Sequence, residues 1–140
     1  MRGVFFIITE KPDHDTNYAT WSQIKEMADG GQEIGSHTDS HPDLAKVSDA
    51  KMIFELLNSK KEIEKRIENT VISLCYPSGK YNARVLKATA ANYLFARTTR
   101  FGKYFDLAKR FEISSIRILP RMNTIFLKFW FNDRFYRQTH

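Results

Sequence analysis

Short apolar runs alternate with segments of helical periodicity along most of this chain. Val4 to Thr9 is a continuous apolar run rich in β-branched and aromatic residues, which predicts a buried strand of a parallel sheet. Further strands are expected over 33–36, 71–76, 93–98 and 113–119. Because strands that alternate with helices are typical of parallel βα units, the pattern predicts an α/β fold.

The helices between these strands have recognisable ends. Thr20 and Gln23 fit a capping box at the start of a helix whose Ile24 and Met27 face inward, and Gly30-Gly31 predicts its end. Ser48 or Asp49 is expected to cap a long amphipathic helix. Its apolar side carries Met52, Ile53, Leu56, Leu57, Ile63 and Ile67. Further helices are expected over 81–91 and from Asn123 onward, and residues 99–110 are expected to be irregular or helical.

The length of 140 residues suits one domain spanning 1–140, and it is short for a complete (β/α) barrel of about 250 residues. The net charge is +6, but Lys and Arg are spread along the chain, which favours solvated helix faces. Nucleic-acid binding would rest on net charge alone, so no nucleic-acid partner is predicted. A single cysteine, Cys75, allows no intrachain disulfide.

Membrane and export signals are the next property that the sequence constrains. The apolar region from Ile113 to Phe131 is interrupted by Arg117, Arg121 and Lys128, so no membrane span is predicted. The apolar start is too short for a signal-peptide core, which leaves the localisation open.

His37 and His41 are the residues that most strongly suggest chemistry. They are spaced i, i+4, after a predicted strand that ends in Gly35-Ser36 and just before Pro42. If the segment forms a helical turn, both imidazoles point to one side and can reach one divalent ion at about 2.0–2.1 Å. From the spacing alone, two surface histidines are the favoured interpretation. The position at the carboxyl end of a strand strengthens the metal hypothesis, since working residues of α/β folds lie there.

Four aspartates could in principle complete such a site. Asp13 and Asp15 follow the first predicted strand, where a solvated polar loop is the favoured interpretation. Asp39 lies between the histidines and points elsewhere if they share a face. Asp43 is expected to be a turn or cap residue.

Two stretches carry a resemblance to a known family. Residues 33–44 read EIGSHTDSHPDL and closely resemble the second motif of the polysaccharide deacetylase (NodB-homology) family, His-Ser/Thr-x-x-His/Asp. Residues 75–82 read CYPSGKYN and resemble its third motif, Arg-x-Pro-Tyr/Phe-Gly. Residues 18–28 look like the helix before the second motif, and Arg117-Ile118 resembles the close of one subgroup. The resemblance implies an incomplete, deformed (β/α) barrel of the polysaccharide deacetylase type.

The resemblance also implies a metal-dependent hydrolase that removes N-acetyl groups from a polysaccharide by cleaving a C–N bond. In the family, two His and one Asp hold a divalent ion, often zinc, which activates a water. His37 and His41 match the two histidine ligands. The backbone N–H of Ser78 matches the oxyanion donor. Tyr76, Pro77 and Gly79 match the groove that binds the acetylated polysaccharide.

This sequence departs from the family pattern at several points. Cys75 stands where the family has the Arg that orients the catalytic base, and Ser78 replaces the usual aromatic residue. The Thr-Phe-Asp-Asp motif, which supplies that base and the third metal ligand, is not recognisable, and neither is the Leu-x-His motif that supplies the acid.

Three expectations follow from these departures. Loss of the base removes a factor of roughly 10²–10⁴ in rate, so activity of the isolated chain should be impaired. The alternative function is a non-catalytic remnant that binds glycan or serves as an interaction module. A barrel that lacks its first βα unit also exposes strand edges, which predicts association of copies.

Overall fold

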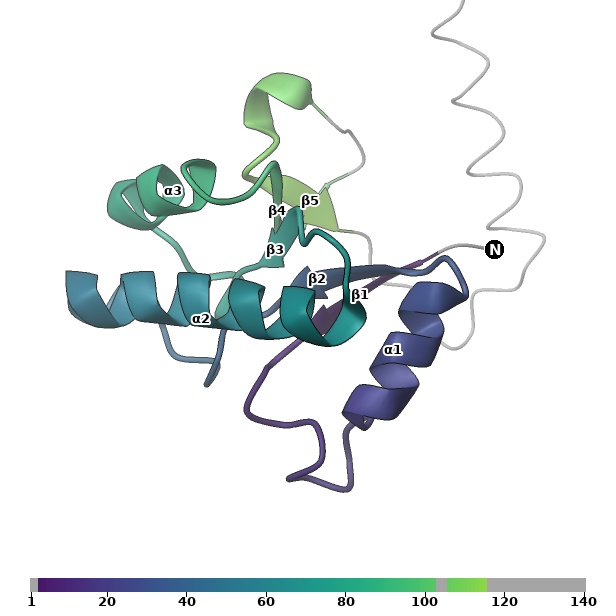
Figure 1. The fold of residues 1–140 in the computed structure, drawn as a ribbon. Helices are drawn as coiled ribbons and strands as arrows, with labels where there is room; N and C mark the ends of the chain where they lie inside the picture. The colour runs from purple at the N-terminus through teal and green to yellow at the C-terminus, as the bar shows by residue number, and fades with distance from the viewer. Residues whose placement is uncertain (1–2, 103–105, 116–140) are drawn as a thin grey trace, which may run out of the picture.

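The computed structural model describes residues 3–102 and 106–115 (Figure 1). The predicted closing helix from Asn123 and the Arg117-Ile118 pair lie outside these residues. In chain order the elements are β1 (Val4–Ile7), α1 (Trp21–Asp29), β2 (Glu33–Ser36), α2 (Asp49–Ile67), β3 (Ser73–Cys75), the 3₁₀ turn η1 (Pro77–Gly79), α3 (Ala83–Ala90), β4 (Phe95–Phe101), the 3₁₀ turn η2 (Leu107–Lys109) and β5 (Ile113–Ser115).

The described strands form one sheet in the order β1-β2-β3-β4-β5, and every neighbouring pair is parallel. A consecutive order is that of a (β/α) barrel, because a doubly wound sheet reverses its order partway across. Among the described residues the sheet is open, with β1 and β5 as its edges. The predicted α/β class and incomplete barrel are therefore confirmed.

The three α-helices of the described residues share one hydrophobic core with the same face of the sheet. Right-handed crossovers between neighbouring parallel strands place consecutive helices on one face, which explains this arrangement. The strand residues of this core alternate with residues that point to the opposite face. The shared core includes Ile34, Leu74 and Ala96 from the strands, Ile24 from α1, Met52, Leu56, Ile63 and Ile67 from α2, and Val85 from α3.

The helix boundaries follow the sequence signals closely. The Thr20 side chain accepts a hydrogen bond from the Gln23 N–H, and the Gln23 side-chain oxygen accepts one from the Thr20 N–H, so the predicted capping box is confirmed. Ser48, rather than Asp49, is the N-cap of α2. The prediction that Ile53 faces the core is wrong, because its side chain is exposed.

The strands differ most from the predictions at β1 and at the end of β4. Val4 to Thr9 was expected to be a buried strand, but β1 ends at Ile7, and Val4 and Phe5 are 46% and 43% exposed. The physical reason is that β1 is an edge strand, paired with β2 alone in the described sheet. β4 continues to Phe101, beyond the predicted end at Thr98, because its later residues pair with β5.

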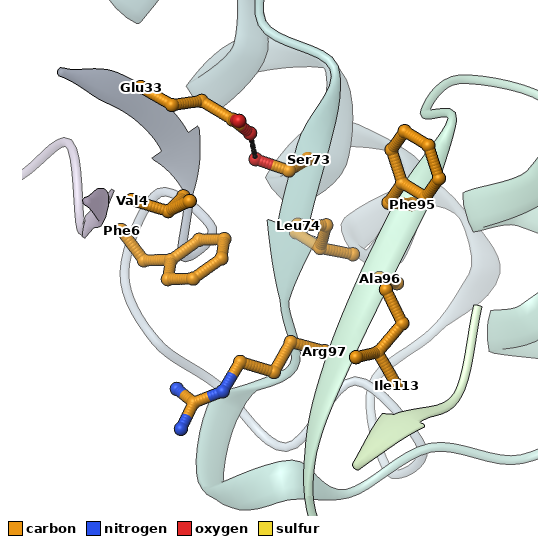
Figure 2. Close-up of a pocket in the computed structure, with 9 residues that line it drawn as sticks. All are labelled: Val4, Phe6, Glu33, Ser73, Leu74, Phe95, Ala96, Arg97 and Ile113. Atoms are coloured by element: carbon orange, nitrogen blue, oxygen red, sulfur yellow. Dashed lines mark hydrogen bonds between the residues drawn. The ribbon is translucent and has the colours of Figure 1, made fainter. Parts of the chain in front are cut away.

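The face of the sheet opposite the helices bears a cavity of about 520 Å³ (Figure 2). Figure 2 shows Phe6 projecting over this cavity, and Glu33 accepting a hydrogen bond of 2.6 Å from the Ser73 hydroxyl beside it. Arg97 extends its guanidinium from β4 at the other end of the cavity. No described helix is both long enough and apolar enough to cross a membrane.

Candidate active site

Two segments meet at the carboxyl edge of the sheet: the loop 37–43 after β2, and the turn Pro77–Gly79 after β3. The Nδ1 atom of His37 lies 2.7 Å from the backbone oxygen of Cys75, which is the last residue of β3. The His37 N–H also donates to the Ile7 carbonyl at the end of β1, at 2.8 Å. The predicted placement of both segments at strand ends is therefore confirmed.

The rings of His37 and His41 face each other in an edge-to-face arrangement. Their centroids are 4.6 Å apart and their planes are inclined by 77°. Two imidazoles that share one ion at about 2.0–2.1 Å have centroids roughly 4.5–5.5 Å apart, so the observed separation is compatible with one shared ion. The helical turn considered from the sequence is wrong, because Thr38 and His41 have φ values of 68° and 61°. Reversals of the backbone, rather than helical spacing, bring the rings together.

The hydrogen bond to Cys75 fixes the protonation of His37. A carbonyl oxygen can only accept, so Nδ1 carries the hydrogen and the lone pair of the neutral ring lies on Nε2. This is how a histidine ligand is usually prepared for a metal. Burial lowers the pKa of His37, although the bond to Cys75 partly opposes this effect. The His37 ring is therefore neutral over a wider pH range than the ring of a free histidine.

Asp39 and Asp43 do not join the two rings. Oδ1 of Asp39 accepts hydrogen bonds from the Thr9 hydroxyl and from Nδ2 of Asn58, so this carboxylate points into the protein interior. Asp43 accepts from the Ala45 N–H at 3.2 Å, as a turn residue does. Both placements agree with the sequence interpretation.

The carboxylates of the loop after β1 are also hydrogen-bonded within the protein. Oδ1 of Asp13 accepts from the Trp21 N–H at 3.2 Å, at the start of α1. Oδ1 of Asp15 accepts from both the backbone and the side chain of Asn17. Within residues 3–102 and 106–115, no group of three or more His, Cys, Asp or Glu side chains could hold a metal ion. The carboxylates of Asp13 and Asp15 are therefore engaged away from the histidine pair.

The turn after β3 is closed by its own backbone. The N–H groups of Gly79 and Lys80 donate to the carbonyls of Tyr76 and Pro77 at 2.9 and 3.0 Å, so both are engaged within the turn. Ser78 is exposed and has a left-handed φ of 54°. Gly79 has φ 69°, and a Cβ there would lie 2.8 Å from the Thr99 nitrogen, so only glycine fits.

Tyr76 supports this turn from inside the protein. Its side chain is fully buried, its hydroxyl donates to the Phe111 carbonyl at 3.1 Å, and its ring stacks on Tyr81. Burial raises the pKa of Tyr76 to about 12. The phenol is therefore committed to the core, and Tyr76 can contribute to a groove through its backbone and by holding the turn.

The sequence interpretation missed two residues near the site. Arg97 on β4 is the register partner of Cys75, and Cys75 occupies the position at which the family motif has an arginine. Burial raises the pKa of the Cys75 thiol, and Arg97 opposes this by its charge and a hydrogen bond. Glu55 on α2 is fully buried against the loop after β2. The register between β3 and β4 shows that Arg97 lies beside Cys75, and strand register cannot be read from a single sequence.

Comparison with known proteins gives consistent results. A family model described as polysaccharide deacetylase matches residues 1–94. The chain is 29% identical over 124 residues to the putative polysaccharide deacetylase YxkH of Bacillus subtilis, covering 88% of this chain and 44% of that protein.

Solved structures agree. The Streptococcus pyogenes deacetylase PplD in complex with acetate superposes with a TM-score of 0.82 at 31% identity, over 89% of this chain and 56% of that one. BC0361, a polysaccharide deacetylase from Bacillus cereus, gives 0.81 at 27% identity, over 91% and 40%. The chain spans about half the length of the relatives that it matches.

Proposed function

Because the chain belongs to the polysaccharide deacetylase family, we propose that it carries part of a hydrolase site that removes acetyl groups from an acetylated polysaccharide. The observation that carries the proposal is the ring pair of His37 and His41, whose centroids are 4.6 Å apart at the carboxyl edge of the sheet. The proposal treats residues 1–140 as one domain, which the single shared core of the described residues supports.

In this proposal, Nε2 of His37 and one ring nitrogen of His41 hold a divalent ion, with zinc as the expected metal for imidazole ligands. When bound, such an ion polarises an acyl carbonyl and lowers the pKa of a bound water. His37 itself is oriented by the Cys75 carbonyl and kept neutral by burial. The third ligand comes from outside the described residues, because none of these completes the set.

The turn after β3 provides the candidate oxyanion donor. The N–H groups of Gly79 and Lys80 are engaged within the turn, so the N–H of exposed Ser78 is the one we assign to the substrate oxygen. A rigid backbone donor needs no reorganisation during the reaction. In this proposal Pro77 and Gly79 belong to the wall of the substrate groove beside it, and Tyr76 supports the turn from inside the protein. The similar deacetylase PplD has been captured with acetate, the product that deacetylation releases.

We further propose that the isolated chain turns over slowly. The carboxylates of Asp13, Asp15 and Asp39 are engaged in hydrogen bonds within the protein, so none of them is placed to serve as the base. Absence of a base costs roughly 10²–10⁴-fold in rate. Binding of glycan without turnover is the outcome that would favour a non-catalytic role.

Release of acetate from N-acetylglucosamine oligomers, with zinc supplied, tests the function. We expect slow zinc-dependent release that is lost in His37→Ala and His41→Ala and kept in His14→Ala, which changes a histidine of another loop. Release that is unaffected by His37→Ala would refute the proposed site. Turnover equal to that of complete family members would refute the proposed impairment.

The exposed edge of the sheet supports a separate proposal of self-association. Val4 and Phe5 lie on β1, whose outer edge pairs with no other strand in the described sheet. Unprotected strand edges favour pairing between chains. Sedimentation analysis should show concentration-dependent dimers, and a monodisperse monomer at all concentrations would contradict this.

A further inference from the structure

Glu55 is a buried carboxylate that points from α2 into the loop between the two histidines. Its Oε2 atom accepts hydrogen bonds from the N–H groups of Asp39 and Ser40, both at 2.9 Å. Its Oε1 atom accepts from the Ser40 hydroxyl at 2.6 Å and pairs with Nζ of Lys51 at 2.9 Å. Three of these four contacts are therefore with residues that lie between His37 and His41.

A carboxylate is costly to bury unless its charge is paired and its oxygens are hydrogen-bonded. Glu55 has an exposed fraction of 0% and lies on the face of α2 that otherwise carries Met52, Leu56 and Ser59. An apolar residue would be the ordinary choice at such a position. The four donors around Glu55 satisfy it, which means that the loop and the carboxylate are matched to each other.

The loop needs this support because its backbone is strained. Thr38 and His41 both have positive φ, a conformation that is sparsely populated by non-glycine residues and persists only when the surrounding structure holds it. Between them, the N–H groups of Asp39 and Ser40 converge on one oxygen of Glu55. Rotation of this short segment would break both bonds and change the direction in which the His41 ring points.

We propose that Glu55 is the positioning residue of the histidine pair, holding residues 39–40 so that the rings of His37 and His41 face one ion. The inference rests on the proposed metal site, although Glu55 is not itself one of the ligands. It acts through the backbone of the loop.

A contact to the segment that follows this loop has a different role. Arg84 on α3 donates to the carbonyls of Leu44 and Val47, at 3.2 and 2.8 Å. These carbonyls follow the histidine pair, so Arg84 fixes where the chain goes after the site. Glu55 acts between the two ligands and therefore sets their mutual geometry.

Glu55→Gln is the test variant, and Glu64→Gln is its matched control. Glutamine keeps the size of the side chain, but only one of its two terminal atoms can accept a hydrogen bond. Glu64 lies on the same helix, also accepts from a backbone N–H (that of Val71, at 3.0 Å), and pairs with Lys60. Both variants thus remove the charge of a helix carboxylate that accepts from the backbone of another segment, and only Glu55 contacts the histidine loop.

Two measurements on the 140-residue chain separate the possibilities. Amide hydrogen exchange without metal should become faster at Asp39 and Ser40 in Glu55→Gln, and stay unchanged there in Glu64→Gln. Zinc affinity, measured by calorimetry on the folded variants, should fall at least about tenfold in Glu55→Gln, as is usual when a residue supporting a ligand is lost. Zinc affinity equal to that of the unchanged chain would overturn the inference, even if Glu55→Gln were less stable.

Two further outcomes have defined meanings. If Glu55→Gln does not fold, Ser40→Ala removes only the hydroxyl contact, and it should weaken zinc binding several-fold; unchanged affinity would overturn the inference. If zinc affinity is the same in His37→Ala as in the unchanged chain, the proposed function fails instead. The exchange measurement still decides the positioning role in that case, because unchanged protection of Asp39 and Ser40 in Glu55→Gln would overturn it.

Discussion

The loop after β2 and the turn after β3 lie at the same edge of the sheet, but they are held in different ways. The loop depends on side chains: Glu55 binds the N–H groups of its residues 39 and 40. The turn depends on backbone hydrogen bonds and on shape, since Gly79 lies directly against Thr99. The loop should therefore respond to charge and pH, and the turn to side-chain volume.

Of the variants that test this comparison, Gly79→Ala should have the largest effect on stability. The added methyl group meets the Thr99 nitrogen at 2.8 Å and forces a non-glycine residue into φ 69°. Strain and overpacking together should lower the free energy of unfolding by about 2–5 kcal/mol. Urea unfolding followed by circular dichroism measures this loss.

Gly30→Ala is the control for Gly79→Ala. Gly30 has φ −72°, and a Cβ there would lie 3.3 Å from the nearest atom, the Glu26 carbonyl oxygen. Its effect should stay within about 1 kcal/mol. If the two glycines gave equal losses, the turn would not be held by shape as described.

The second prediction uses acid to test the loop. Burial alone would raise the pKa of Glu55, but hydrogen bonds from Ser40 and the charge of Lys51 outweigh it and lower the pKa below the ordinary value of 4.5. A depressed pKa means that the ionised form stabilises the native state above the unfolded-state pKa, and that this stabilisation is lost as pH falls through the folded-state pKa.

The advantage of the unchanged chain over Glu55→Gln in free energy of unfolding should therefore be constant above about pH 5 and shrink below about pH 4. Urea unfolding across this range measures it. An advantage that is independent of pH would show that the charge of Glu55 does not hold the loop.

Lys51→Gln should have the smallest effect. Lys51 pairs with Glu55 at 2.9 Å, but its side chain is 46% exposed, so solvent screens the pair and the backbone donors still satisfy the carboxylate. We expect a slight loss of thermal stability and unchanged protection of the Ser40 amide. Loss of that protection would mean that the lysine, rather than the loop backbone, keeps Glu55 in place.

The fold was predictable from the sequence because its signals are local. The capping box at Thr20, the Ser48 cap and the glycines after α1 each act within a few residues, and each was confirmed. Exposure was harder to predict. The run from Val4 has the composition of a buried strand, but burial depends on which strands pair beside it, and Val4 lies on an edge.

The histidine pair of the candidate site was recognisable in the sequence, but its geometry was not. The spacing of His37 and His41 suggested a helical turn, whereas left-handed backbone at Thr38 and His41 brings the rings together. That backbone is stabilised by Glu55, which is distant in sequence and reads as one more charged position of an amphipathic helix. Contacts of this kind arise only when α2 packs against the loop.

Titration with cobalt(II), a coloured substitute for zinc, tests most directly whether His37 and His41 share one ion. The account predicts visible absorption bands that saturate at one ion per chain and disappear in both His37→Ala and His41→Ala, with His14→Ala unchanged. Bands that persist at full strength in either single variant would contradict a shared site.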